Sequence, residues 1–298
     1  MKESRKTGHL LTEKINPRTT HLDKCSPLEV VELILEEDRA IVEAIGQQKN
    51  NIAKAVELVT VKLKLGGRLF FIGAGTSGRL GVIEAAECPP TFGTDPELIQ
   101  GFIAGGREAI WQSIEGAEDS TLESQVFLEE AGLTKNDVVV GIAASASTPF
   151  VESGLRYANQ RGSGSVLVTC NTVESKIANV TIELLVGPEV VVGSTRLKAG
   201  TVTKMVLNMI TTASMVQLGK TYGNLMVDVQ PKSAKLRDRA KRIVAHIAEV
   251  NEEKANELLL ESEWDVKASI VMAKKGLGLK DAKELLMSKN GFLREALK

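Results

Sequence analysis

A glycine-rich loop, Gly73-Ala74-Gly75-Thr76-Ser77-Gly78-Arg79, has the residue types and spacing best suited to chemistry. It directly follows the apolar run Leu69–Ile72 and opens a predicted helix that we expect to end at Pro89-Pro90. Glycines let a backbone approach an anion, and the free amides and positive dipole at a helix start attract phosphate. Thr76 and Ser77 add hydroxyl donors. The loop therefore predicts a phosphate site, with a tight structural turn as the alternative.

The same loop satisfies G-x-G-x-x-G, the fingerprint of dinucleotide-binding folds. Such folds place an acidic residue about 20 positions later, at the end of the second strand. Here that strand ends in Ile103-Ala104-Gly105-Gly106, and the Gly-Lys-Ser/Thr ending of a P-loop is missing. The sequence therefore favours a small phosphorylated sugar over a nucleotide.

A second loop, Ala143-Ala144-Ser145-Ala146-Ser147-Thr148-Pro149, also follows an apolar run and opens a predicted helix, with Pro149 suited to the first turn. Ligands of open parallel sheets sit outside the carboxyl ends of the strands, where both loops would lie. We expect Ser145 and Ser147 to join Thr76 and Ser77 around one phosphate.

Four glutamates are candidates for acid and base chemistry, as two pairs spaced by three residues: Glu84 with Glu87, and Glu115 with Glu118. Glu87 precedes Cys88-Pro89-Pro90, near the expected ligand edge. Glu118 lies in a glycine-containing segment after the second strand. Two carboxylates in different environments can divide the acid and base roles, although a solvated surface charge is the alternative for any one of them.

A third segment, Gly193–Thr201, precedes a predicted long helix and carries Arg196 and Lys198 near its start. Basic residues at a helix start are unfavourable to the helix dipole, so a bound anion would rationalise them. An ordinary surface loop is the alternative.

The rest of the composition excludes several kinds of protein. Lys and Arg number 37 against 38 Asp and Glu, without long single-sign blocks, so we expect neither a nucleic acid nor a membrane surface as partner. Three dispersed cysteines and three histidines predict neither a metal site nor a histidine triad. The start of the chain has no apolar signal segment and no run reaches the length of a membrane span, so we expect a cytoplasmic protein.

Apolar runs alternate with helical stretches, which predicts an α/β fold. Ser26-Pro27-Leu28-Glu29 reads as a capping box that starts two helices running to Leu65. A doubly wound, mainly parallel five-stranded sheet follows, and its buried strands are predicted at Arg68–Ile72, Leu98–Ala104, Val138–Ala143, Ser165–Thr169 and Val180–Val186. The expected organisation is a lead (1–25), a sugar-phosphate-binding domain with N-terminal helices (26–225), a linker (226–235) and a small all-helical domain of three or four helices (236–298).

The loop Gly73–Arg79, extended through Gly93, closely resembles the N-acetylmuramic acid 6-phosphate etherases of the sugar isomerase (SIS) fold group. So do further segments along nearly the whole chain, namely Ile103–Arg107, Glu115–Ser120, Asp137–Ser145, Gly193–Lys204 and Gly223–Val229. The resemblance implies a homodimer that cleaves the lactyl ether of the phosphorylated sugar to N-acetylglucosamine 6-phosphate and D-lactate, without metal or nucleotide.

The same resemblance implies Glu87 as the general acid and Glu118 as the other catalytic carboxylate. Family members often have Gly-Arg where this chain has Ala146-Ser147, a departure that bears on how the second loop meets the ligand. Two alternatives stay open: an amino-sugar-phosphate isomerase, and a non-catalytic sugar-phosphate sensor resembling glucokinase regulatory proteins.

Overall fold

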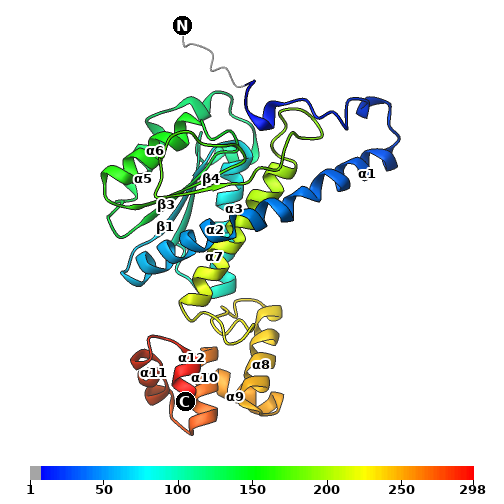
Figure 1. The fold of residues 1–298 in the computed structure, drawn as a ribbon. Helices are drawn as coiled ribbons and strands as arrows, with labels where there is room; N and C mark the ends of the chain where they lie inside the picture. Colours follow the sequence, from blue (N-terminus) through cyan, green and yellow to red (C-terminus); the bar gives the residue numbers. More distant parts are fainter. Residues whose placement is uncertain (1–7) are drawn as a thin grey trace. The chain divides into compact units, whose positions relative to one another are not determined.

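The computed structural model describes residues 8–298, so the first seven residues of the predicted lead lie outside it. The chain divides into two compact units (Figure 1). One runs to Ala86 and resumes at Glu97–Thr211, and the other comprises Glu87–Pro96 and Thr212–Lys298. The boundary therefore falls within a helix, α3 (Gly75–Phe92).

A five-stranded parallel sheet forms the centre of the first unit, as the sequence predicts. Its strands run in the order β2-β1-β3-β4-β5, and every neighbouring pair is parallel. Their bounds are β1 Leu69–Gly73, β2 Ile99–Ile103, β3 Val138–Ile142, β4 Gly164–Thr169 and β5 Val180–Glu183. The strand order reverses between β1 and β3, which creates the topological switch point at which open α/β sheets bind ligands.

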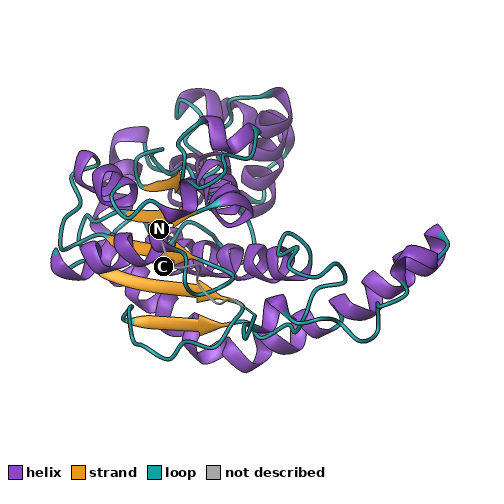
Figure 2. Cartoon of the chain, turned by 90° about the horizontal axis from the view of Figure 1, so that it is seen from above, coloured by secondary structure: helices purple, strands orange, loops and turns teal. Residues whose placement is uncertain are grey.

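Helices cover both faces of the sheet (Figure 2). α5 (Glu123–Glu130) and α6 (Pro149–Gln160) pack over Phe70, Ile72 and Val139 on one face. α2 (Ala40–Lys64) packs against β3, β4 and β5. Burial on both sides explains why β1, β3 and β4 read as continuous apolar runs, whereas the edge strands β2 and β5, predicted as buried, are mostly half-buried.

The two predicted N-terminal helices are confirmed as α1 (Pro27–Asp38) and α2. Ser26 accepts a hydrogen bond from the Glu29 amide while the Glu29 carboxylate accepts one from the Ser26 amide, which completes the predicted capping box. Three-residue 3-10 turns precede them at Leu11–Glu13 and Leu22–Lys24. α1 reaches away from the sheet (Figure 1). Its apolar side chains Leu28, Val31 and Leu35 form a stripe that is 66%, 52% and 61% exposed.

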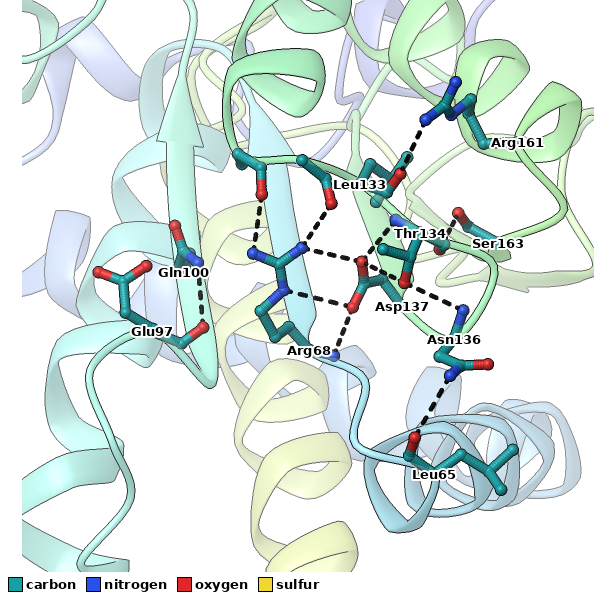
Figure 3. Close-up of polar contacts among 12 residues, drawn as sticks. Leu65, Arg68, Glu97, Gln100, Leu133, Thr134, Asn136, Asp137, Arg161 and Ser163 are labelled. Carbon is teal, nitrogen blue, oxygen red and sulfur yellow. Dashed lines mark hydrogen bonds and ion pairs between the residues drawn. The ribbon is translucent and has the colours of Figure 1, made fainter.

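An ion pair between Arg68 and Asp137 joins the amino-terminal ends of β1 and β3 (Figure 3). Arg68 donates to Asp137 from its backbone amide at 2.7 Å and from its guanidinium at 3.1 Å, and Thr134 donates to the same carboxylate. Burial favours the neutral acid, but the hydrogen bonds from Arg68 and Thr134 outweigh it and hold the pKa of Asp137 below its usual 3.8. This anchor fixes the register of the two strands whose opposite ends carry the predicted phosphate loops.

The prediction that the helix after the first loop ends at Pro89-Pro90 is wrong. Both prolines lie inside α3, which continues to Phe92. Each proline removes its own amide donor and crowds the carbonyl of residue i−4, but both fall in the last turn of α3, so the disruption stays at the helix end.

The second unit contains five helices among its described residues, one or two more than predicted. They are α8 Ala234–Ala248, α9 Glu252–Glu261, α10 Val266–Lys275, α11 Leu279–Ser288 and α12 Leu293–Leu297. Short turns at Gly276-Leu277-Gly278 and Asn290-Gly291 separate the last three, and the helices share one apolar core that includes Val244, Leu259 and Ile270. Across residues 8–298, no helix combines the length and the apolar character needed to traverse a bilayer.

Candidate functional site

The two predicted phosphate loops begin side by side at the switch point. Gly73, the last residue of β1, is in register with Ile142, the last residue of β3. α3 begins at Gly75 after the first strand, and α6 begins at Pro149 after the second. Two helix starts are thus held at the same carboxyl edge, where their amides can serve one anion.

Glycine is required at several points of the first loop. A Cβ at Gly78 would lie 2.6 Å from the carbonyl oxygen of Gly73, so only glycine lets the first turn of α3 pack against the end of β1. Gly75 adopts φ +52°, and a Cβ there would meet nothing within 4 Å. The loop is therefore closely packed at Gly78, against the end of β1, and has open space at Gly75, from which a ligand would approach.

A cavity of about 80 Å³ joins the first loop to the segment that carries the predicted base. Gly75 and Arg79 line it together with Glu115 and Glu118. Arg79 donates to the carbonyl oxygens of Ile110 (3.0 Å) and Gln112 (3.1 Å), which ties the segment to α3. The tertiary structure thus brings Glu118 to the phosphate loop through an arginine that sequence reasoning left without a role.

Glu118 lies in a 3-10 turn, Ala117–Asp119, after a left-handed Gly116 with φ +77°. The side chain is exposed in the described chain. The neighbouring Glu115 accepts a hydrogen bond from Ser113 at 3.0 Å. Glu118 therefore lines the cavity and is also in contact with solvent.

Long, weak hydrogen bonds to its own hydroxyls shape the second loop. The amide of Ser147 donates to Ser145 Oγ at 3.4 Å, and Ser145 Oγ lies 3.5 Å from Thr148 Oγ1. Ala146 adopts φ +64°, a conformation that costs an alanine about 1–2 kcal/mol. Ala146 thus has the left-handed backbone conformation that glycine adopts without strain.

The third segment starts α7 (Lys198–Gln217), and the charge of Lys198 is already paired. Lys198 is 2% exposed, and its Nζ lies 2.5 Å from Glu37 Oε2. Arg18 contacts the other oxygen of Glu37 at 2.6 Å. Arg196, in contrast, is exposed.

The start of α7 also lies close to the first loop. A Cβ added at Gly200, two residues after Lys198, would be 3.5 Å from Thr76 Cγ2.

A buried carboxylate caps the start of α7. Glu189 accepts hydrogen bonds from the amides of Lys198 (3.2 Å) and Ala199 (3.0 Å). Burial raises the pKa of Glu189 above its usual 4.5, although these amides oppose the rise. No sequence pattern indicated this capping residue, which occupies two amides at the helix start where a bound anion was expected.

The two glutamates of α3 have different environments. Glu84 is buried and accepts hydrogen bonds from Thr211 Oγ1 at 2.5 Å and from the side-chain amide of Asn208, both on α7. Glu87, predicted as the acid, is exposed and belongs to the other unit of the chain. Within residues 8–298, no group of three or more His, Cys, Asp or Glu side chains is placed to hold a metal ion.

Known proteins match the chain over nearly its full length. It is 50% identical over 291 residues to "N-acetylmuramic acid 6-phosphate etherase" of Geobacillus thermodenitrificans, covering 97% of this chain and 99% of the relative. It is 48% identical over 300 residues to the protein of that name from Trichodesmium erythraeum, covering 100% and 98%.

A family profile and a solved structure match parts of the chain. Residues 51–159 match the profile "Glucokinase regulatory protein N-terminal SIS domain". A structure titled as a phosphoheptose isomerase from Francisella tularensis aligns with a TM-score of 0.45 at 15% identity, over 62% of this chain and 98% of that chain.

Proposed function

Because the chain belongs to the N-acetylmuramic acid 6-phosphate etherase family, we propose that it cleaves the D-lactyl ether of N-acetylmuramic acid 6-phosphate. The products are N-acetylglucosamine 6-phosphate and D-lactate, as in the recycling of cell-wall amino sugars. The observation that carries this conclusion is the 50% identity to such an etherase across 97% of the chain.

The first half of the reaction is an elimination. The C1 aldehyde of the open-chain sugar acidifies the C2 proton, which the Glu118 carboxylate removes to give an enolate. The enolate electrons form the C2=C3 double bond while the C3–O bond breaks, and the Glu87 carboxylic acid protonates the departing oxygen. D-Lactate leaves with its ether oxygen as the hydroxyl. Each such proton transfer typically accounts for ~10²–10⁴ in rate.

The second half adds water to the double bond, and the two proton transfers of the elimination run in reverse. Glu87, now a carboxylate, removes a proton from water as its oxygen bonds to C3 of the unsaturated aldehyde. Glu118, now protonated, returns a proton to C2. Both side chains end in their starting states, so the cycle needs no further acid or base.

The 6-phosphate binds at the switch point in this proposal. Gly75, Thr76 and Ser77 offer amides and hydroxyls at the start of α3, and Ser145 and Ser147 offer hydroxyls from the second loop. We assign most of the charge compensation to Arg196, because Glu37 already pairs with the Lys198 ammonium; Lys198 then shapes the start of α7. Remote phosphate binding places C2 against its base.

The cavity shared by Gly75 and Glu118 supports this arrangement.

The test is to incubate the purified protein with the substrate and assay D-lactate. We expect Glu118→Gln and Glu87→Gln to bind substrate normally but to lose ~10²-fold or more in kcat. Glu115→Gln, in the same cavity and equally exposed, is the matched control and keeps its turnover. Lactate release at the wild-type rate from either catalytic variant would reject the assignment.

Product analysis separates this function from its alternatives. An isomerase would convert an amino-sugar phosphate without releasing lactate, and a sensor would bind without turnover. The profile match to a regulatory protein covers only residues 51–159. In water labelled with ¹⁸O, elimination and hydration place the label in the C3 hydroxyl of the product, whereas direct displacement at the lactyl carbon leaves C3 unlabelled.

The quaternary and domain organisation are part of the proposal. We propose a cytoplasmic homodimer in which residues 26–225 catalyse and residues 236–298 form an accessory domain after a linker at 226–235. The exposed apolar stripe of α1, Leu28, Val31 and Leu35, supports the dimer because a second copy can cover it. Sedimentation should give twice the 32.1 kDa of one chain.

A further inference from the structure

The second unit contains a pocket of about 350 Å³ that the proposed reaction does not use. One wall is the segment Asn224-Leu225-Met226, and the other is a face of α8. The α8 side chains that line it are Arg239, Arg242, Ile243 and His246. The pocket therefore combines cationic groups with apolar side chains.

α8 concentrates positive charge in this unit. It carries five Lys and Arg residues against a single acidic residue, Asp238. Arg239, Arg242 and His246 follow the spacing that places side chains on one side of a helix, over about 10 Å along its axis. The two arginines and His246 thus form a row along one wall.

This positive charge is mostly unbalanced. Arg242 pairs with Asp238 at 2.9 Å, but both side chains are more than 60% exposed, so the pair is weak and a ligand can compete for Arg242. Within residues 8–298, no carboxylate forms an ion pair with Arg239, whose guanidinium donates to Met226 Sδ at 3.5 Å. A thioether is a weak acceptor, so most of the five donors of this half-buried arginine remain available.

The opposite wall is held in place before any ligand arrives. Tyr222 and Leu225 exchange two backbone hydrogen bonds, at 3.1 and 3.0 Å, around Gly223 with φ +58°. The guanidinium of Arg294 lies 4.6 Å from the centre of the Tyr222 ring. The turn therefore holds Asn224, with its side-chain amide, and Met226 beside the arginines of the pocket.

We propose that this pocket is a second ligand site, which binds the phosphate of a small phosphomonoester. A fork of guanidinium donors matches phosphate oxygens in two-point contacts, and Arg242 and His246 supply further donors along the row. Asn224 can bond a hydroxyl of the ligand, and its carbon skeleton rests on Met226 and Ile243. The site consists of residues outside the catalytic set and does not depend on the proposed reaction.

Methyl NMR of the full chain tests the proposal, because Met226 is one of only seven methionines. The chain is labelled with ¹³C at the methionine methyls, and a Met226→Leu spectrum assigns the reporter signal. The probes are inorganic phosphate and glycerol 3-phosphate, with D-lactate as a carboxylate and sodium chloride at matched ionic strength. We expect a saturable shift of the Met226 signal with both phosphate probes and none with sodium chloride.

Substitutions locate the binding. Arg239→Gln should weaken the phosphate affinity about tenfold or more, the loss expected for a charge-assisted hydrogen bond, and Arg242→Gln should weaken it less. Lys235→Gln removes the same charge from an exposed position of α8 outside the pocket and leaves the affinity unchanged, as does Ser77→Ala in the first catalytic loop. A Met226 signal that does not saturate, or equal responses from Arg239→Gln and Lys235→Gln, would overturn the proposal. Equal affinity for D-lactate would overturn the ligand class.

Discussion

Replacing Glu37 by glutamine leaves a buried ammonium without its anion. Lys198 and Glu37 are each 2% exposed, and their charged atoms are 2.5 Å apart. Burial favours the neutral acid, but the hydrogen bond and charge of Lys198, aided by Asn16 and Arg18, hold the pKa of Glu37 below 4.5. The carboxylate is therefore ionised at neutral pH, and the variant loses a full negative charge next to Lys198.

Breaking one side of a buried pair costs about 3–5 kcal/mol, because the remaining charge stays desolvated. Arg18 adds little to this figure because its side chain is 61% exposed. For a unit of this size, each kcal/mol shifts Tm by about 2–4 °C. We therefore expect Glu37→Gln to lower the Tm of the first unit by about 6–20 °C, measured by calorimetry and by urea unfolding.

Two matched variants make the reasoning refutable. Glu36→Gln removes an exposed carboxylate from the same helix, where it pairs with Arg39 at 3.0 Å, and should change the free energy of unfolding by less than about 1 kcal/mol. Glu37→Leu combined with Lys198→Met removes both charges and should recover most of the stability. The reasoning fails if Glu37→Gln costs no more than Glu36→Gln, or if the double variant is no more stable than Glu37→Gln.

Two further predictions follow from the sheet and the second loop. Asp137→Asn lowers Tm by a constant amount at neutral pH; because the folded pKa of Asp137 lies below 3.8, this difference should shrink only as the pH falls below that value. A difference that disappears already at pH 6 contradicts the assigned cause. Ala146→Gly relieves the strain of φ +64° and should raise the free energy of unfolding by about 0.5–1 kcal/mol, after the entropy of glycine is subtracted. Ala131→Gly, where φ is −69°, should instead destabilise, and the same sign for both in urea unfolding would refute the argument.

The sequence predicted those parts of the fold that depend on neighbours along the chain. All five strands are present, and the three central ones, β1, β3 and β4, carry the clearest signal because every residue in them is buried. The Ser26 and Glu29 capping box formed as predicted, since its two partners are three residues apart. The phosphate loops could be placed at one edge of the sheet because each directly follows a strand. Position relative to a strand end is enough to predict that edge in a parallel sheet.

Local patterns were less reliable where several weak signals compete. Pro89 and Pro90 suggested a helix end, yet α3 continues to Phe92. The C-terminal helices were undercounted because the five-residue helix Leu293–Leu297 is too short to show a hydrophobic period.

Only the tertiary structure decided which charged groups face one another. Lys198 looked like a phosphate ligand in the sequence, but Glu37, 161 residues away, pairs with it. Arg79 supports the segment that carries Glu118, and Glu189 caps α7. Such partners meet because the sheet and its helices bring distant segments together. The residues next to a group in the sequence do not reveal these distant contacts. The sequence therefore determines which groups are available, and the fold determines what each one does.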